Sequence, residues 1–306
     1  MAAVEKYTLR ELEQLIKNGA KFRLFKPFYY NNQILFNVEK ILTEKDILRL
    51  EGKVFGPIEV VPTVEHNTDD KIRAAIIENC IKILKTSSLF KPSEQHHLDF
   101  NKRKEVEKLF NGIINASPHL AQKMLDIYQF SKKLFVHSIN VAIISTVIEM
   151  GIQEKKKQHN GLRLEELLTG ALLHDVGFLN LPKSLVEKRR IEYTDEEKKI
   201  YRTYPEEGKK IATSLGSEIR NKSVEIIYQH QERLNGSGFP QGLKGNKIEE
   251  LALVVGLADE FDLVVSKEIV DAQRTVSDAM SRFSRYGQLI GSHIVDSFYT
   301  WFRYLR

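Results

Sequence analysis

An apolar run ends at two ionisable side chains in the stretch Ala171-Leu172-Leu173-His174-Asp175-Val176-Gly177. The residues from Leu164 onward form the same helical pattern, so the imidazole and the carboxylate fall at the C-terminal end of a buried helix. Burying two adjacent ionisable groups is unfavourable unless they pair or bind a cation. The dipeptide is therefore either a structural hydrogen bond that caps the helix or part of a metal site. Its nitrogen and oxygen atoms suit Fe, Mn or Zn.

Three other segments place metal-type ligands at comparable positions. His137 belongs to a series of otherwise apolar residues spaced three and four apart, so we expect it on the buried face of a predicted helix. Asp259 follows the apolar run 254–258, and His230 stands near a helix end before a glycine-rich loop. Taken singly, each residue has a purely structural interpretation. His137 could be a buried structural histidine, Asp259 an exposed carboxylate, and His230 a cation at a helix end. Together, four helices that each present one or two ligands are typical of a metal centre in a helical bundle.

Length and composition favour a folded protein of about two domains. The chain has 306 residues, 42% of them hydrophobic, which is enough for a proper core. The net charge of +5 is compatible with an anionic partner such as a nucleotide. The basic clusters mostly lie beside glutamates, as on solvated helix faces, so we expect no nucleic-acid polymer as a partner. These clusters are Lys155-Lys156-Lys157, Lys188-Arg189-Arg190, Lys198-Lys199 and Lys209-Lys210.

The sequence predicts a cytoplasmic protein without a membrane partner. The apolar segment from Leu134 to Ile148 is interrupted by His137 and Asn140, so it is interpreted as a buried helix rather than a membrane span. The N-terminus lacks the apolar core of a secretory signal. Cys80 is the single cysteine and falls at helical spacing with isoleucines, which indicates a small buried hydrophobic residue.

The pattern along the chain predicts a mainly α fold with a small N-terminal α+β domain. Residues 7–62 combine a helix over 9–17 with β-rich runs at 22–25, 33–38 and 58–61, and Asn31-Asn32 is a hairpin-turn signal. Thr68 caps a helix predicted over 69–85, so we place the domains at 1–68 and 69–306. The further predicted helices cover residues 101–114, 118–130, 132–150, 163–173, 194–215, 217–233, 247–264 and 272–304, the last broken near Gly287.

The order of the chemical motifs resembles an HD-GYP domain of the HD phosphohydrolase superfamily. The motifs are His137, His174-Asp175, the run from Gln229 to Pro240, and Ala258-Asp259, and they spread over residues 120–265. The resemblance implies an HD-type helical bundle and a bacterial signalling enzyme that hydrolyses cyclic di-GMP at a centre of two or three metal ions. The N-terminal module is similar to the accessory domains that often precede HD-GYP domains, which implies a regulatory role.

The resemblance implies that the first metal site is whole. Its ligands would be His137, His174, Asp175 and Asp259. Asp175 would also bridge to a second metal and would be the catalytic carboxylate. The resemblance implies iron or manganese as the metal. If both sites were filled, the centre would be binuclear.

The second site is depleted in this sequence. The family uses three histidines there, and the corresponding positions hold Tyr204, His230 and Gln231. A phenolate and an amide oxygen are poorer ligands than imidazole for a transition metal, so the second metal is in doubt. Lys133 replaces the glutamate that serves a third metal in some members, so no third metal is expected.

The substrate side departs from the family as well. Phe178 stands where the family has a lysine that faces the phosphate, and the Arg-Pro-Tyr segment of the family is not found in Ser266-Lys267-Glu268-Ile269. Phe239 replaces the tyrosine that names Gly-Tyr-Pro. The residues expected beside the substrate are Gly236, Ser237, Gly238 and Phe239. Small side chains would let the backbone approach a phosphate, and a plain turn between helices is the alternative.

Three functions stay open at the level of sequence. The first is a metal-dependent phosphodiesterase, in which metal-activated water attacks cyclic di-GMP. The second is a degenerate HD-GYP protein that binds a cyclic dinucleotide or a protein signalling partner without turnover, which the replacements at Phe178, Tyr204 and Gln231 favour. The third is hydrolysis of another nucleotide. The retained histidines and aspartates favour the enzyme, because buried ionisable groups without a metal are unfavourable.

Overall fold

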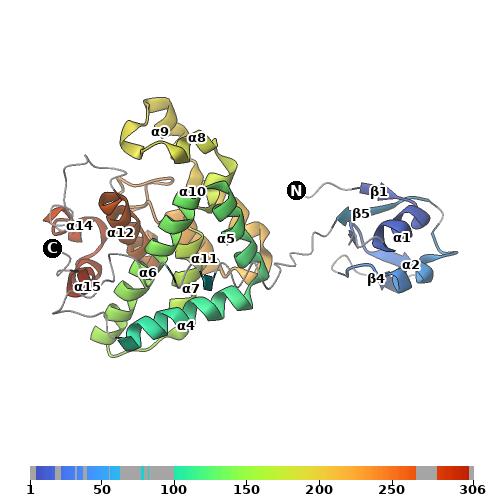
Figure 1. Ribbon diagram of the computed structural model, residues 1–306, viewed down its shortest axis with the longest axis horizontal. Coiled ribbons are helices and arrows are strands. Elements are labelled where there is room, and N and C mark those ends of the chain that lie inside the picture. The colour runs from blue at the N-terminus through green and yellow to red at the C-terminus, as the bar shows by residue number, and fades with distance from the viewer. Residues whose placement is uncertain are drawn as a thin grey trace. The chain divides into compact units, whose positions relative to one another are not determined.

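The computed structural model describes residues 5–17, 22–31, 33–36, 40–54, 56–62, 77–78, 82, 100–266 and 281–302. The chain divides into two compact units, Met1–Asn67 and Thr68–Arg306, and each unit is treated by itself (Figure 1). Cys80 and most of the helix predicted over 69–85 lie outside the described residues, as does the first part of the helix predicted over 272–304.

The first unit is a small α+β module. Its elements are β1 (Glu5–Tyr7), α1 (Leu9–Lys17), β2 (Phe22–Leu24), β3 (Phe28–Tyr30), β4 (Gln33–Phe36), α2 (Glu44–Leu50) and β5 (Ile58–Pro62). Strand β5 lies between β1 and β2 in an antiparallel three-stranded sheet, while β3 and β4 form a separate hairpin. The predicted hairpin is confirmed by the pairing of Tyr30 with Gln33, and Asn31 adopts the left-handed φ of 50° that asparagine tolerates, while Asn32 lies outside the described residues.

One detail of this unit differs from the sequence prediction. The strand that enters the hairpin is β3, whereas the run 22–25 supplies β2 and pairs with β5. Leu12 of α1 and Ile47 of α2 are buried together with Phe22, Leu24 and other apolar side chains of the module. The module therefore has a hydrophobic core of its own.

The second unit is helical, as predicted. Its longer elements are α4 (Phe100–Ala116), α5 (Pro118–Phe130), α6 (Lys132–Lys155), α7 (Gly161–Leu172), α8 (Lys183–Glu187), α9 (Asp195–Tyr201), α10 (Tyr204–Ser214), α11 (Asn221–Gln229), α12 (Glu250–Val265), α14 (Gly287–Ile290) and α15 (Ser292–Phe302). Short 3₁₀ turns cover η2 (Val176–Asn180), η3 (Arg190–Glu192), η4 (Gly216–Glu218) and η5 (Gly245–Lys247).

Two predicted helices have wrong bounds. The segment 194–215 is two helices, because Pro205 lacks an amide hydrogen and starts α10 anew after α9. The segment 217–233 is helical only over α11. The break predicted near Gly287 is confirmed, because residues 284–286 form a turn directly before α14, and the chain breaks again at Gly291, whose φ of 113° favours glycine.

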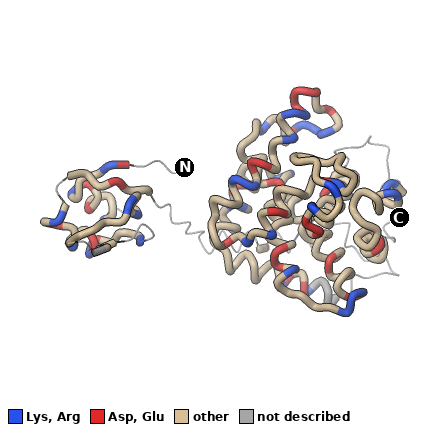
Figure 2. The backbone as a smooth tube through the Cα atoms, turned by 180° about the vertical axis from the view of Figure 1, so that it is seen from behind, with Lys and Arg blue, Asp and Glu red and all other residues tan. Residues whose placement is uncertain are grey.

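Helix α6 is the core of the second unit. Helices α5, α7, α12 and α15 all contact it (Figure 1). It is long and apolar enough to cross a membrane, but 89% of its most apolar stretch is buried inside the unit, so the prediction of a buried helix is confirmed. Lysines and arginines are interspersed with aspartates and glutamates along the described chain, as Figure 2 shows.

Two glycines allow helices to approach the His174-Asp175 turn. A Cβ on Gly177 would lie 1.9 Å from the carbonyl oxygen of Tyr204, where α10 begins. A Cβ on Gly256 would lie 2.3 Å from the carbonyl oxygen of His230, at the end of α11. Both distances are far inside van der Waals contact, so only glycine lets α10 and α12 come this close.

Candidate metal centre

Four helices bring the predicted ligands together in the interior of the second unit. His137 comes from the first half of α6 and Asp259 from α12, while His174-Asp175 follows α7 and His230 follows α11. His174, Asp175 and His230 are fully buried, and His137 and Asp259 are at most 7% exposed. Such a cluster of imidazoles and carboxylates in a core is unfavourable unless its charges are compensated.

The ligand atoms of the predicted first site converge. His137 Nε2 lies 3.3 Å from His174 Nε2 and 3.0 Å from Asp259 Oδ1. Asp175 Oδ2 lies 3.5 Å from both ring nitrogens. Atoms of His137, His174 and Asp259 lie within 4.8 Å of one another, and so do atoms of His174, Asp175 and His230. Two nitrogens and two carboxylates at this spacing can hold a divalent transition metal.

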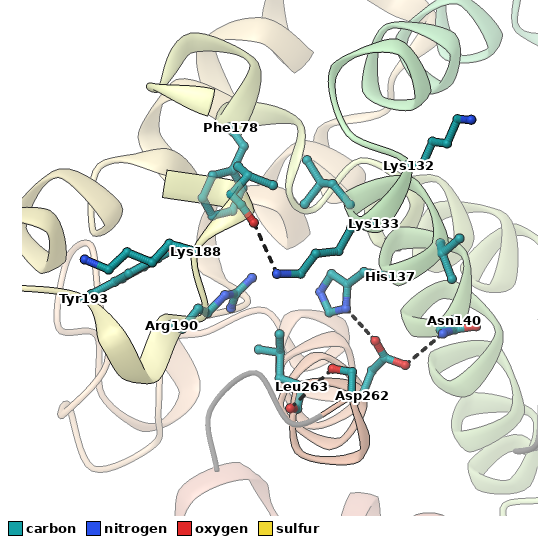
Figure 3. Close-up of a pocket in the computed structure, with 14 residues that line it drawn as sticks. Lys132, Lys133, His137, Asn140, Phe178, Lys188, Arg190, Tyr193, Asp262 and Leu263 are labelled. Carbon is teal, nitrogen blue, oxygen red and sulfur yellow. Dashed lines mark hydrogen bonds and ion pairs between the residues drawn. The ribbon is translucent and has the colours of Figure 1, made fainter. Parts of the chain in front are cut away.

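Hydrogen bonds to Nδ1 orient the three imidazole rings of the cluster. His174 Nδ1 donates to the carbonyl of Ala171 (2.7 Å), and His230 Nδ1 donates to the carbonyl of Ile227 (2.8 Å). His137 Nδ1 donates to Asp262 Oδ2 (2.7 Å), whose other oxygen accepts from the Asn140 amide (2.9 Å; Figure 3). Each Nε2 therefore faces the centre, as metal-binding histidines require.

The charges of the cluster also fit a cation. Burial opposes protonation of His137, but hydrogen bonds to Asp259 and Asp262 raise its pKa to about 10. Burial disfavours ionisation of Asp259 too, yet Arg190 and His137 hold the pKa of that carboxyl well below its usual range. Asp175 Oδ1 is buried and has no hydrogen-bond partner among the described residues. A metal ion would supply the partner that this oxygen lacks and would replace the proton on His137.

The residues of the predicted second site bind one another. Because Nδ1 of His230 carries its proton, Nε2 accepts, and the Tyr204 hydroxyl donates to it at 2.5 Å. The Gln231 amide donates to the Tyr204 hydroxyl (2.9 Å) and to Asp259 Oδ2 (2.6 Å). Burial and the nearby Tyr201 raise the pKa of Tyr204 well above its ordinary value, and burial together with His174 lowers the pKa of His230 to about 4. All three side chains are thus held in neutral forms.

Arg190 enters the centre, which the sequence did not predict. The cluster Lys188-Arg189-Arg190 was interpreted as a solvated face, and for Arg190 this was wrong, since its side chain is only 12% exposed. Its Nη2 donates to Asp175 Oδ2 at 3.2 Å, and its Nη1 donates to the Tyr201 hydroxyl at 3.0 Å. Periodicity does not reveal this position, because Arg190 begins the three-residue turn η3, which is too short for a helical pattern.

Two cavities flank the centre. The larger has a volume of about 400 Å³ and is lined by His137, Phe178, Lys188, Arg190 and other side chains that Figure 3 shows. The smaller, of about 180 Å³, is lined by Tyr201, Gln231, Arg233, Asp259 and further residues, Arg190 among them. Apolar rings and cations beside a metal-type cluster suit an anionic ligand with aromatic groups.

The loop predicted to lie beside the substrate packs against α9 and against the residues that follow α11. A Cβ on Gly238 would meet the backbone of Gln231 and Glu232 at 2.4 Å, and the Phe239 ring contacts the ring of Tyr201. The Glu232 carboxylate accepts three backbone N–H groups just beyond the loop, from Gln241, Gly242 and Leu243. Gly236, Ser237, Gly238 and Phe239 line neither of the two cavities, so their role in substrate binding stays a prediction.

Comparison with known proteins identifies the family. A family model described as HD domain matches residues 109–292. The chain belongs to the HD domain family. Among curated proteins, a cyclic di-GMP phosphodiesterase of Thermotoga maritima is 32% identical over 151 residues, which are 49% of this chain and 39% of that protein. The cyclic di-GMP phosphodiesterase PdeB of Borreliella burgdorferi is 32% identical over 132 residues, 42% of this chain and 32% of that protein.

The matches to these relatives are partial. The HD domain chain spans less than half the length of either one. A solved structure, Bd1817, an HDG"Y"P protein from Bdellovibrio bacteriovorus, is 16% identical with a TM-score of 0.48, and the match covers 91% of this chain and 92% of that one. The prediction of an HD domain is confirmed.

Proposed function

We propose that this HD domain protein is a metal-dependent phosphodiesterase that hydrolyses cyclic di-GMP or a related cyclic dinucleotide. The observation that carries the proposal is the buried cluster of His137, His174, Asp175 and Asp259, whose ligand atoms converge beside two cavities with cationic linings. The partial similarity to cyclic di-GMP phosphodiesterases supports the substrate class.

The four residues of this cluster are proposed to hold one divalent ion, iron or manganese. When bound, such an ion would lower the pKa of a bound water and neutralise charge on a phosphate. Asp262 and the carbonyl of Ala171 keep the two histidines turned toward the centre. The four residues are at most 7% exposed, and the low dielectric of such surroundings strengthens electrostatic interactions within the site.

The larger cavity is proposed to receive the dinucleotide. Lys133, Lys188 and Arg190 line it and would attract the two phosphates. The rings of Phe178 and Tyr193 line the same cavity and offer flat apolar faces to a guanine base. A volume of about 400 Å³ is in the range of small-molecule sites.

A binding protein without turnover is the second candidate. The hydrogen bonds among Tyr204, His230 and Gln231 favour it, because these side chains satisfy one another without a second metal. A second metal would have to break both hydrogen bonds. In this candidate the dinucleotide, or a protein signalling partner, would bind to a centre with one metal or none.

Metal analysis combined with an activity assay tests the proposal. Anaerobically purified protein is analysed for bound metal, and cyclic di-GMP hydrolysis is followed for the wild type and for Asp175→Ala. We expect bound metal and turnover in the wild type, with both lost in Asp175→Ala. Asp126→Ala is the control, because Asp126 contacts only its neighbours Gln122 and Lys123 on α5 among the contacts described. Binding of cyclic di-GMP without turnover would contradict the enzyme and favour the second candidate.

We propose a cytoplasmic location and a regulatory role for residues 1–68. Deletion of residues 1–67 is expected to change the rate or the ligand response of hydrolysis. Equal kinetics with and without this unit would contradict the regulatory role.

A further inference from the structure

Arg190 is a buried cation whose charge is held by two of the proposed metal ligands. Its Nη2 lies 3.2 Å from Asp175 Oδ2, and its Nη1 lies 3.8 Å from Asp259 Oδ1. Burial opposes its protonation, but Tyr201 and the two aspartates raise the pKa of Arg190 well above its ordinary value. The guanidinium is therefore always charged.

Three other cations that line the two cavities have carboxylate partners outside the centre. These pairs are Lys188 with Glu197 (2.7 Å), Lys198 with Asp195 (3.0 Å) and Arg233 with Glu260 (3.3 Å). Their charges are neutralised whether or not a metal is bound. The charge of Arg190 differs in this respect, because a divalent ion bound to Asp175 and Asp259 would neutralise its counterions. Metal binding would then leave Arg190 with a positive charge to offer to an anion.

The surroundings of Arg190 fix the orientation of its guanidinium. Its central carbon lies 5.7 Å from the Phe178 ring centroid and 5.1 Å from the Tyr201 ring centroid. Arg190 also lines both cavities, so a ligand in either one can reach it. In Figure 3 its side chain points toward His137 from the opposite wall of the larger cavity.

We propose that Arg190 binds a phosphate oxygen of the substrate beside the metal, a role that rests on the proposed phosphodiesterase function. A guanidinium is planar and donates in pairs, which matches the geometry of two phosphate oxygens. Phe178 has no charge to contribute where the resemblance predicts a lysine, and it packs against the guanidinium instead. Arg190 thus supplies from the segment after α8 the charge that the residue after Gly177 does not.

The test compares Arg190→Gln, Arg190→Lys and Arg189→Gln in the full-length, manganese-loaded protein. Arg189 is the matched control, since it is the adjacent arginine but is exposed and pairs with Glu192 (2.6 Å). The affinity for inorganic phosphate is measured by calorimetry, the affinity for Mn²⁺ by titration, and kcat and KM with cyclic di-GMP. We expect Arg190→Gln to weaken phosphate binding by about tenfold or more without weakening Mn²⁺ binding. Arg190→Lys should recover part of the loss, and Arg189→Gln should match the wild type.

The outcomes separate this inference from the proposed function. Wild-type phosphate affinity in Arg190→Gln, or no phosphate binding by the wild type, would overturn the inference, even if cyclic di-GMP is hydrolysed. Weaker Mn²⁺ binding in Arg190→Gln would also overturn it, because Arg190 would then support the metal ligands. Phosphate binding that depends on Arg190, in a protein that does not hydrolyse cyclic di-GMP, would uphold the inference and reject the proposed substrate.

Discussion

His137 shows how a single residue depends on its neighbours in this centre. Its Nε2 faces Asp259 and His174, while Nδ1 is tied to Asp262, which is itself held by Asn140. Without Asp262 the ring could rotate about χ2 and present either nitrogen. The carboxylate that binds no metal thus determines whether His137 can be a ligand.

Asp262→Asn is expected to weaken metal binding by roughly 10–100-fold, because the neutral amide holds the His137 ring less firmly. Far-UV circular dichroism should be unchanged, since the substitution conserves size. The measurement is competitive titration of Mn²⁺ against a chelating dye. Asp126→Asn on α5 serves as the control and should bind Mn²⁺ like the wild type. Equal affinity in Asp262→Asn would show that ring orientation does not limit binding.

The sequence predicted this site better at helical positions than at irregular ones. His137 and Asp259 were found from apolar periodicity, and the structure places both in the cluster with His174 and Asp175. The hydrogen bond from His137 to Asp262, which lies on the same helix as Asp259, was not predicted. Arg190 was missed, because nothing in a short basic run shows which of its members turns inward. The signal that could have found it is the loss of a cation at Phe178, which requires compensation elsewhere.

At the scale of elements, close helix contacts position the ligands. Gly256 of α12 lies against the carbonyl of His230, where an added Cβ would be 2.3 Å from the oxygen. Gly256→Ala is expected to destabilise the second unit by about 1–3 kcal/mol, because backbone at this contact cannot yield as a side chain would. Urea denaturation measures the effect.

Gly112→Ala is the control for this substitution. Gly112 lies in α4, is exposed, and has no described atom within 4 Å of its added Cβ. Alanine there should stabilise the helix by about 0.5–1 kcal/mol. Equal stability of Gly256→Ala and the wild type would mean that α11 and α12 separate easily.

A carboxylate links α5 to the turn η4, and its contribution depends on pH. Glu218 accepts hydrogen bonds from the Ser117 hydroxyl (2.8 Å) and the His119 backbone N–H (3.3 Å). Partial burial opposes ionisation, but these bonds lower the pKa of Glu218 below its ordinary value of 4.5. A lowered pKa in the folded state adds stability above the unfolded-state pKa, and this stability is lost as pH falls through the folded-state pKa.

The wild type should therefore be more stable than Glu218→Gln near pH 6, which is roughly two units above the pKa of a glutamate in the unfolded chain. The difference in stability should vanish as the pH approaches ~3. Chemical denaturation at a series of pH values measures it. Glu165→Gln removes an exposed pair with Arg220 (3.1 Å) and should show only a small effect at any pH. A difference for Glu218→Gln that does not vary with pH would contradict the assignment.

The sequence predicted which segments are helical better than it predicted where each helix begins and ends. The long apolar pattern of α6 identified a core helix correctly. The division between α9 and α10 was missed, although Pro205 was visible in the sequence. Proline fits the first turn of a helix but interrupts a helix interior, so Pro205 should have indicated a new helix. This division matters for the site, since it places Tyr204 at the start of α10 against Gly177.

At the scale of the whole molecule, the two units have separate cores. The described buried residues of the two hydrophobic clusters share no member. Leu12→Ala should lower the thermal transition of the first unit, and Leu168→Ala that of the second, since each side chain is fully buried in its own core. Each truncation is expected to cost about 2–5 kcal/mol. Differential scanning calorimetry resolves the two transitions, and equal shifts of both in either variant would contradict independent cores.

Removal of metal should act on the second unit alone. The cluster of His137, Asp175 and Asp259 buries charges that a divalent ion would compensate, so binding favours the folded state. Free Mn²⁺ at about 100 times its dissociation constant adds roughly 2.7 kcal/mol to stability. A chelator should therefore lower the transition that Leu168→Ala identifies, and added Mn²⁺ should restore it. Asp175→Ala should not respond to either treatment. The transition that Leu12→Ala identifies is the internal reference, and a shift of that transition by the chelator would show that metal binds outside the proposed centre.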